Sequence, residues 1–419
     1  MKRVLMVAFH FPPEGGSSGV LRTLKFSKFL PENGWIPHIL TLKETFYPAQ
    51  DKHLMGDIPK EAVVHRTFAL DSGRHMAIKG RYLACLAVPD RYVSWLPFGM
   101  ARGMKVVRKE AIDVLYSTSP TPTAHLIALT IKARTGLPWV ADFRDPWIEE
   151  GQFPVPGTLR YRIESSLERL VVRHADRVLV TTPNLGREFE SRYPDLARNK
   201  VRVIYNGYDE ADFGGLEEAP RAERFEFIHA GLVTPEFRNP FPLLEEVASL
   251  INEGKLPPDR IRFTFLGGGS YVTSAAFSGA VRELGLDGVV AVEGRIPHRE
   301  ALRRQAGAAV LLLLQASEDT RSLIPAKAFE YLRLGRPVLA MTLEGATADL
   351  LVGMDGCHVV DPSNRTSLRY ALLSLYEEGV SSLKMTTASR PIAQYDRRNL
   401  TVELSRLFNE LVETGRNSR

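Results

Sequence analysis

The sequence alternates short apolar runs with longer helical patterns from its first residues onward. Within the first 42 residues, RVLMVAF and WIPHILTL flank GVLRTLKFSKFL, whose apolar residues recur at helical spacing. A strand, a helix and a second strand in this order form a βαβ unit, and successive units build a parallel sheet. The first half of the chain therefore predicts a doubly wound α/β domain. Its further strands are predicted at 113–119, 138–143 and 176–182, and its further helices at 123–136 and near 157–175.

The same rhythm begins again after VRVIYNGYD, and a polar, glycine-containing stretch at 206–226 separates the two series. The second series of predicted strands lies at 225–231, 261–269, 289–295, 308–315 and 337–341. The sequence thus predicts two Rossmann-like domains that face a cleft, with ligand beyond the carboxyl ends of the strands. We assign 1–205 to the first domain, 206–390 to the second and 391–419 to a C-terminal segment. That segment has Leu400, Leu404, Leu407 and Leu411 on one face of an amphipathic helix.

Composition points to a globular protein in a reducing compartment. The 419 residues are 44% hydrophobic and 25% charged, and the two cysteines lie far apart without metal-ligand spacing. At the N-terminus, His10 and two prolines interrupt a seven-residue apolar run, which predicts a buried strand and no signal peptide. The longest later run, at 308–314, is far shorter than the roughly 20 residues that span a bilayer. We therefore expect a cytoplasmic protein.

The net charge of +5 is compatible with nucleic acid, acidic lipid headgroups or phosphate-bearing small molecules, and equally with ordinary solubility. The sequence contains no recognition helix or zinc finger, so we expect no nucleic-acid partner. Residues 74–110 mix basic and aromatic side chains, a composition that suits association with the inner face of a membrane. The other interpretation is a helical excursion in which Trp95 and Phe98 belong to the core.

Two loops that follow predicted strands carry candidate functional residues. Gly15 and Gly16 follow the first strand, where backbone amides can approach a phosphate, although a simple turn uses the same residues. DFRDPW places Asp142 and Asp145 on either side of Arg144 at a strand end. Such carboxylates need partners when buried, so this loop is either an active-site edge or a structural ion-pair cluster.

The stretch SLIPAKAFEYLRLGRPVLA contains a helix that starts near Pro325 and ends near Gly335. Lys327 lies in the first turn, where the positive end of the helix dipole disfavours a cation. Glu330 lies on the same face and can pair with Lys327. A bound diphosphate is the alternative, because it would interact favourably with both the dipole and the lysine. Glu330 would then accept hydrogen bonds from vicinal hydroxyls.

The order of these motifs resembles the GT-B glycosyltransferases, and most closely family four, the retaining transferases that use nucleotide sugars. The resemblance covers roughly residues 1–415. It implies an acceptor-binding first domain, a nucleotide-sugar-binding second domain and a C-terminal helix that crosses back to the first. The motifs, in order, are FPPEGG, DFRDPW, NGYDEADF, HAGLVTPEFRNP, FLGGGS, EGRIPHREALRRQAGAAVLLL and IPAKAFEYLRLGRPVLA.

The resemblance also implies residue roles. The family's basic-Asn pair matches Arg238 and Asn239 at the diphosphate, whereas its Gly-Arg pair reads Gly231-Leu232 here. The family has two spaced glutamates: the one that binds the ribose matches Glu330, and the one near the donor sugar is replaced by Ser322. In the first domain, Arg144 stands where the family often has a histidine that contacts the donor sugar. The predicted donor-binding residues are Gly15, Gly16, Gly231, Arg238, Asn239, Gly268, Ser322, Leu323, Ile324, Lys327 and Glu330. The predicted catalytic residues are Arg238, Lys327, Asp142, Arg144 and Asp145.

These residues predict transfer of a sugar from a nucleoside-diphosphate sugar to a hydroxyl of a saccharide or lipid-linked acceptor, in polysaccharide or glycoconjugate biosynthesis. The donor is a substrate, and we expect no cofactor and no metal because the sequence has a cationic clamp and no evident DxD element. Three alternatives remain open. They are a nucleotide-sugar epimerase, a non-catalytic nucleotide-sugar-binding protein of the same fold, and a basic scaffold at a membrane surface.

Overall fold

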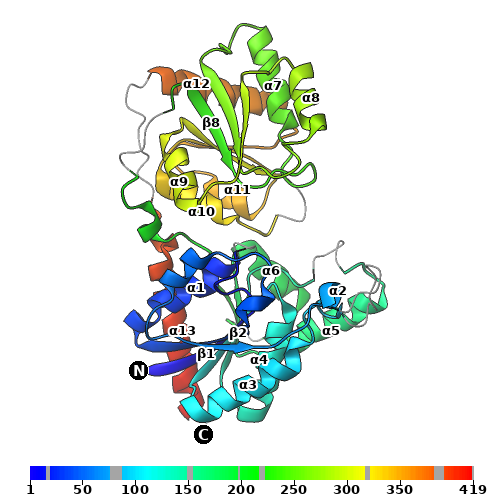
Figure 1. Ribbon diagram of the computed structural model, residues 1–419, viewed down its shortest axis with the longest axis vertical. Coiled ribbons are helices and arrows are strands. Elements are labelled where there is room, and N and C mark those ends of the chain that lie inside the picture. Colours follow the sequence, from blue (N-terminus) through cyan, green and yellow to red (C-terminus); the bar gives the residue numbers. More distant parts are fainter. Residues whose placement is uncertain are drawn as a thin grey trace. The chain divides into compact units, whose positions relative to one another are not determined.

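The computed structural model describes residues 1–15, 19–75, 87–148, 154–196, 199–216, 222–316, 321–381 and 391–417. The chain divides into two units, which are Met1–Asn206 with Arg397–Arg419 (unit 1) and Gly207–Asp396 (unit 2). Each unit is a parallel sheet with helices on both faces (Figure 1). The prediction of two doubly wound α/β domains is confirmed.

The sheet of unit 1 has seven parallel strands in the order β3-β2-β1-β4-β5-β6-β7. Its interior strand β1 pairs with β2 from Lys2 opposite Trp35 to Val7 opposite Leu40. The strands are β1 (Lys2–Ala8), β2 (Trp35–Leu42), β3 (Val63–Thr67), β4 (Val114–Thr118), β5 (Trp139–Phe143), β6 (Arg177–Val180) and β7 (Val201–Val203). The helices are α1 (Val20–Phe29), α2 (Ser72–His75), α3 (Trp95–Glu110), α4 (Pro122–Thr135), α5 (Leu159–His174), α6 (Pro183–Arg192) and α13 (Arg397–Asn417).

Both faces of this sheet are buried because helices cover each of them, and alternate side chains of each strand point to opposite faces. In β1, Leu5 and Val7 pack in a cluster with residues of α3, α4, α5 and α6. Val4 and Met6 point the other way, into a cluster formed with α1 and α13. Parallel strands that are covered on both faces read as continuous apolar runs, which explains why the sequence predicted them well.

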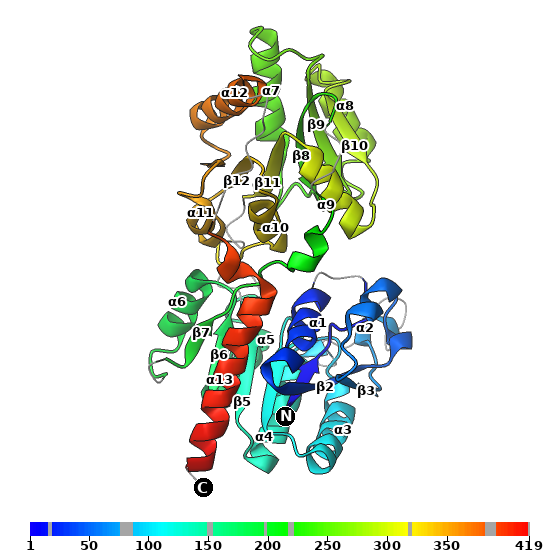
Figure 2. The ribbon, with the colours of Figure 1, turned by 90° about the vertical axis from the view of Figure 1, so that its left-hand side faces the viewer.

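The C-terminal helix α13 belongs to unit 1 (Figure 2). Its Leu400, Leu404, Leu407 and Leu411 are buried in the cluster that covers β1 and β4. The helix starts at Arg397, whereas the predicted C-terminal segment starts at 391.

The sheet of unit 2 has six parallel strands in the order β10-β9-β8-β11-β12-β13. The strands are β8 (Phe225–Ala230), β9 (Ile261–Leu266), β10 (Val290–Glu293), β11 (Val310–Gln315), β12 (Val338–Thr342) and β13 (Cys357–Val360). The helices are α7 (Phe241–Asn252), α8 (Ala275–Glu283), α9 (His298–Gly307), α10 (Ala326–Leu334), α11 (Ala346–Leu351) and α12 (Arg365–Ser381). Short 3-10 helices span Pro31–Asn33, Glu44–Phe46, Lys52–Asp57, Glu210–Phe213 and Ala393–Tyr395.

The segment at 74–110 combines features of both interpretations of its sequence. Trp95 is fully buried and donates from Nε1 to Oγ1 of Thr67 at 2.7 Å, as a core residue should. Phe98 is 46% exposed and packs edge-on against Phe68, which is also exposed. The interpretation that placed both residues in the core therefore holds for Trp95 and is wrong for Phe98. Residues 76–86 lie outside the described part of the chain. Among the described residues, no helix is both long and apolar enough to span a bilayer.

Candidate functional site

In unit 2, Lys327 in the first turn of α10 reaches the carboxyl end of β8. Its Nζ donates to the carbonyl oxygen of Ala230 at 2.6 Å and lies 3.4 Å from Nε2 of His229. The other ring nitrogen of His229, Nδ1, lies 3.0 Å from the carbonyl of Leu312 and must therefore donate to it. Nε2 is then unprotonated and accepts from Lys327. The lysine is thus held at the end of the strand where ligands of such sheets bind.

Gly231, which follows β8, leaves room for this lysine. Its φ is +115°, and a Cβ at this position would lie 2.8 Å from the Nζ of Lys327. Most side chains are excluded both by that backbone conformation and by the contact. The next residue, Leu232, is 51% exposed and stands where the resemblance implies a second cation. Lys327 and Arg238 therefore supply the cationic side chains predicted here.

The pKa values of Lys327, His229 and Arg238 are all lowered, which favours their neutral forms. Burial and, to a smaller extent, the charge of Arg238 lower the pKa of Lys327 to about 7, against the opposing effect of Glu330. Burial also lowers the pKa of His229 well below its usual range, and the charges of Lys327 and Arg238 act in the same direction. Burial lowers the pKa of Arg238 as well. Two cations that disfavour each other's charge form a site that an anion would stabilise.

Arg238 and Asn239 lie in the loop between β8 and α7. The backbone N–H of Arg238 donates to Thr234 at 2.9 Å, and no residue in the described ranges accepts a hydrogen bond from its guanidinium group. The side chain of Asn239 is already used, because its Oδ1 accepts from the amide of Phe241 at 3.0 Å and so supports the start of α7. Arg238 is therefore the member of this pair that is better placed to bind an anion.

Glu330 accepts from the Nε2 atom of His298 at 2.9 Å. Lys327 donates to the end of β8 instead, so the hydrogen-bonded Lys327–Glu330 pair considered from the sequence is not formed. Three residues apart, the two still share a helix face and interact through space. Glu330 remains partly exposed on that face, where it can exchange the histidine for a ligand hydroxyl.

The loop that leads into α10 is held by its neighbours. The carbonyl of Leu323 accepts from Nε2 of Gln315 at 3.1 Å and from Oγ1 of Thr347 at 2.9 Å. The flanking Ser322 and Ile324 are both buried. The sequence predicted a helix that starts near Pro325, and the structure makes this proline the N-cap residue of α10, which has no polar side chain to accept from the first amides of the helix. These contacts fix the direction in which α10 starts.

Gly268 lies after β9, where its carbonyl accepts from the amide of Val233 at 2.9 Å. A Cβ on Gly268 would lie 2.6 Å from Cγ2 of Val272. This glycine therefore links the loop after β8 to the loop after β9, and the two loops adjoin the Lys327 site.

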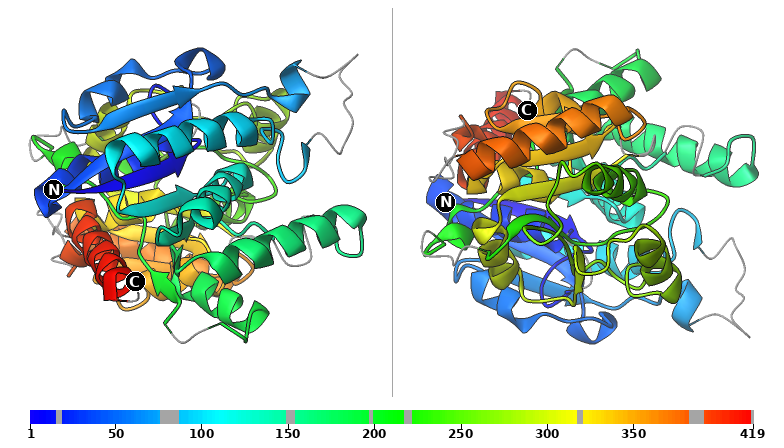
Figure 3. Two further views of the ribbon diagram at one scale, coloured as in Figure 1. Left: turned by 90° about the horizontal axis from the view of Figure 1, so that it is seen from below. Right: turned by 90° about the horizontal axis from the view of Figure 1, so that it is seen from above.

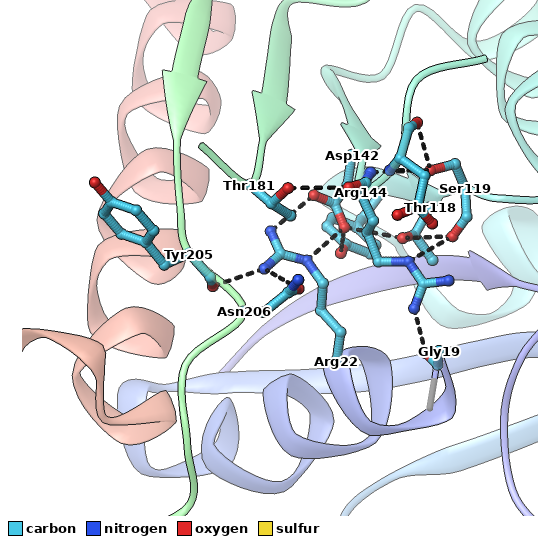
Figure 4. A network of polar contacts seen from close by, with 11 residues as sticks. Gly19, Arg22, Thr118, Ser119, Asp142, Arg144, Thr181, Tyr205 and Asn206 are labelled. Carbon is cyan, nitrogen blue, oxygen red and sulfur yellow. Dashed lines mark hydrogen bonds and ion pairs between the residues drawn. The ribbon is translucent and has the colours of Figure 1, made fainter. Parts of the chain in front are cut away.

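In unit 1, Asp142 at the end of β5 forms the centre of a buried network (Figure 4). Arg22 of α1 binds both carboxylate oxygens, through Nε at 2.9 Å and NH2 at 2.8 Å. Tyr116 and Thr118 donate to the same carboxylate at 2.5 and 2.9 Å. The Arg22 guanidinium and these donors hold the pKa of Asp142 below its usual range despite burial. With four donors and no exposure, Asp142 is positioned to organise this part of unit 1 and not to take a proton from a substrate.

Arg144 follows β5 and is also buried. Its Nε donates to the carbonyl of Ser119 at 2.7 Å, and its NH1 donates to the carbonyl of Gly19 at the start of α1. Its amide donates to Oγ of Ser119 at 2.9 Å. Burial lowers the pKa of Arg144, while Asp145 and Asp142 raise it through their charges. The side chain thereby ties the loops after β4 and β5 to α1 (Figure 4).

The loop after β1 is only partly described. The amide of Gly15 donates to the carbonyl of Ala49 at 3.0 Å, so it would have to exchange this bond to bind a phosphate. A Cβ on Gly15 would lie 2.8 Å from the backbone nitrogen of Asp51. Gly15 therefore has a packing reason to be glycine. Gly16 lies outside the described residues.

Among the described residues, the structure brings Arg238, Lys327 and Glu330 together in unit 2. In unit 1 it brings Asp142, Arg144 and Asp145 together, whereas Gly15 contacts the segment at 49–51. Sequence reasoning missed His229, which is hidden inside an apolar strand, and His298, the partner of Glu330. It also missed Arg22, which lies 120 residues from its partner Asp142 in the sequence. No spacing rule signals such a pair, because the fold alone brings α1 to the end of β5.

Comparisons with known proteins agree with this architecture. Residues 60–207 match the family model described as "Glycosyl transferase 4-like domain". Sucrose-phosphate synthase from Thermosynechococcus elongatus has the same fold, with a TM-score of 0.67 at 15% identity over 99% of this chain and 100% of that chain. Residues 60–207 of unit 1 thus resemble a glycosyl transferase 4-like domain, and the chain has the GT-B fold. The predicted resemblance to GT-B glycosyltransferases is confirmed.

Two further solved structures share the GT-B fold. HepE from Anabaena, solved with UDP and glucose, has a TM-score of 0.62 at 15% identity over 98% of this chain and 99% of that chain. A putative UDP-N-acetylglucosamine 2-epimerase from Listeria monocytogenes has a TM-score of 0.58 at 13% identity, over 98% of each chain. No curated protein sequence matches the chain.

Proposed function

We propose that this protein is a glycosyltransferase that moves a sugar from a nucleoside-diphosphate sugar to a hydroxyl of a saccharide or lipid-linked acceptor, with retention of configuration. The single observation that carries the proposal is the pair of Lys327 and Arg238 near the start of α10. Burial and mutual repulsion bring the pKa of Lys327 to about 7, which is the electrostatic situation that a diphosphate relieves. The glycosyl transferase 4-like match and the UDP bound in HepE support the same donor class.

The proposed roles follow from charge development during transfer. As the bond between the anomeric carbon and the diphosphate oxygen breaks, negative charge grows on the leaving diphosphate. Lys327, Arg238 and the first amides of α10 would stabilise that charge more in the transition state than in the bound donor. The acceptor oxygen forms the new bond to the anomeric carbon and passes its proton to an oxygen of the leaving phosphate. Asp145 is the alternative base, whereas Asp142 and Arg144 hold the loops of unit 1.

Donor binding needs no metal in this proposal, because the lysine and arginine supply positive charge. Glu330 would bind the ribose hydroxyls after releasing His298. We place the reaction in polysaccharide or glycoconjugate biosynthesis, at the cytoplasmic side of a membrane, where lipid-linked acceptors are found.

The first test is a thermal-stability titration with nucleoside diphosphates and their sugars, followed by transfer assays with the best donor. A ligand at about 100 times its Kd stabilises the folded protein by close to 2.7 kcal/mol. We expect one nucleotide to produce this shift and Lys327→Ala to reduce it. We also expect Lys327→Ala to lower transfer by about 100-fold, because one positioned donor at a developing anion contributes roughly 3 kcal/mol. Full transfer by folded Lys327→Ala would refute the role of the lysine.

Glu330→Ala separates ribose binding from chemistry. We expect it mainly to raise the donor KM, and unchanged affinity for the nucleotide would contradict the ribose role.

An epimerase is the second candidate, because Leu232 leaves one clamp cation absent and the Listeria protein shares the fold. Nucleotide-dependent isomerisation of the donor sugar, without transfer to any acceptor, would favour the epimerase.

A further inference from the structure

Helix α5 of unit 1 presents an exposed face that combines apolar and cationic side chains. Leu159 is 73% exposed, Ile163 is 40% exposed and Leu170 is 42% exposed, although the helix packs against the core along its other side. Spacings of four and seven residues place the three on one face. Figure 3 shows α5 extending outward from unit 1. Three large apolar side chains on one face of a protruding helix indicate an interaction surface.

The charged residues of the same face are arginines. Arg162, Arg169 and Arg173 are all exposed and alternate with the apolar residues along the helix. None of the three guanidinium groups forms an ion pair with any residue in the described ranges, although Arg169 lies over the ring of Tyr193 at 5.7 Å. Outside the helix, the ammonium group of Lys200 donates to the carbonyl of Arg173 at 2.7 Å and adds a fourth cation. This face is therefore complementary to an anionic surface.

The acidic residues of α5 are turned away from this face. Glu164 is buried and accepts from Nε1 of Trp147 at 3.0 Å and from Nε of Arg160 at 2.6 Å. Glu168 is fully buried too, and its two oxygens accept from Arg192 and from the amide of Ile148.

These internal bonds fix the rotation of the helix about its axis. Since Glu164 and Glu168 are the acidic residues of α5, the outward face carries no carboxylate of this helix, and its exposed charged side chains are arginines. The N-terminus of the helix is fixed as well, because Oγ1 of Thr158 accepts from the amide of Tyr161 at 3.2 Å. The face therefore exists before any partner binds, and binding does not require the helix to form.

We propose that the outward face of α5 docks on an anionic phospholipid surface. A rigid helix with arginines interleaved among leucine and isoleucine suits the boundary between headgroups and acyl chains, where guanidinium groups bind phosphates and apolar side chains enter the acyl region. A nucleic acid would use the arginines but leave the apolar side chains exposed to water. The docking surface is a property of unit 1 and is independent of the donor site, so it is tested without transfer activity.

The experiment is co-sedimentation of the full chain with vesicles of neutral phosphatidylcholine or of phosphatidylcholine containing 30% phosphatidylglycerol. We expect binding to the anionic vesicles alone, and weaker binding as salt rises. Each basic residue near an anionic leaflet contributes about a fivefold factor, so the triple variant R162Q/R169Q/R173Q should partition about 100-fold more weakly. The triple variant L159S/I163S/L170S should also lose binding, since it removes the groups that enter the acyl region.

A matched control on α3 separates the face of α5 from net charge. Lys105, Arg108 and Lys109 are exposed on that helix, and K105Q/R108Q/K109Q removes the same three charges. We expect the control to retain most of the binding. Equal loss in the control, or no binding of the unaltered protein to either vesicle, would overturn the proposal. So would a homodimer that the L159S/I163S/L170S variant dissociates, because the face would then contact a second copy. All of these positions are exposed, and unchanged thermal midpoints verify that the variants fold.

Discussion

Binding of a nucleotide sugar should draw a proton onto Lys327. In the free protein its pKa is about 7, compared with an ordinary value of 10.5, because of burial and the charge of Arg238. A diphosphate beside the ammonium group favours the charged form and raises the pKa again. At about pH 8 the free lysine is about 10% protonated and the bound lysine is almost fully protonated. Each bound donor should therefore take up about 0.9 proton.

The sign of the pH dependence follows from these states. Below about pH 6 the lysine is charged with and without donor, so affinity should not depend on this group. Between about pH 7 and the ordinary pKa of 10.5, only the bound form is charged, and affinity should fall as pH rises. From pH 8 to pH 9 the expected loss is about ninefold if the bound lysine regains its ordinary pKa.

Isothermal titration calorimetry at pH 8, in buffers with different ionisation enthalpies, measures the proton uptake directly. UDP-glucose is a suitable first probe, because both of its phosphates are esterified and do not titrate in this range, unlike the terminal phosphate of a free nucleoside diphosphate. Two variants serve as matched controls. Lys327→Arg keeps the charge at all these pH values and should bind with little proton uptake, whereas Lys327→Met should also remove the pH dependence.

His229 remains in both variants, so a proton taken up by His229 on donor binding would be measured as residual proton uptake in both. A binding enthalpy that is the same in all buffers, with donor affinity intact, would refute the reasoning. It would mean that the diphosphate does not contact Lys327.

Two further perturbations test the packing around these groups. Gly231→Ala should destabilise unit 2 by about 1–3 kcal/mol and weaken donor binding, because the φ of Gly231 is +115° and the new Cβ would displace the Nζ of Lys327. Urea unfolding measures the loss of stability, and calorimetry measures the loss of donor affinity. Unaltered values for both would contradict the steric argument. Asp142→Asn should cost about 3–5 kcal/mol in urea unfolding, because it leaves Arg22 buried without its counter-charge. The pKa of Asp142 is lowered in the folded state, so its contribution to the free energy of unfolding is present above about pH 4 and is lost as pH falls through the folded pKa. If Asp142→Asn and the unaltered protein lose stability equally as pH falls, the ion pair contributes nothing.

The sequence predicted most of the strands because their signal is local. Ten strands were predicted within a few residues of their observed bounds, and nine of them are interior strands that are buried on both faces and read as short apolar runs. The tenth, β10, is an edge strand. The strands that it did not predict, β3, β7 and β13, are short and lie at or near sheet edges, where burial is weaker. The start of α10 was also local information, since a proline and a terminal glycine are capping signals read within one helix.

The sequence by itself determined that Lys327 stands in a first helical turn against the helix dipole, and hence that an anion was to be expected there. Only the tertiary structure decided what surrounds it, since Ala230 and His229 come from a strand almost 100 residues away. The same holds for Asp142, whose counter-charge Arg22 reaches it because β1 lies next to β4 and β4 next to β5. It also holds for α5, whose outward face depends on which glutamates find buried partners. Strand and helix positions follow from the burial of neighbouring residues along the chain, whereas pairing of charges follows from the order in which strands assemble.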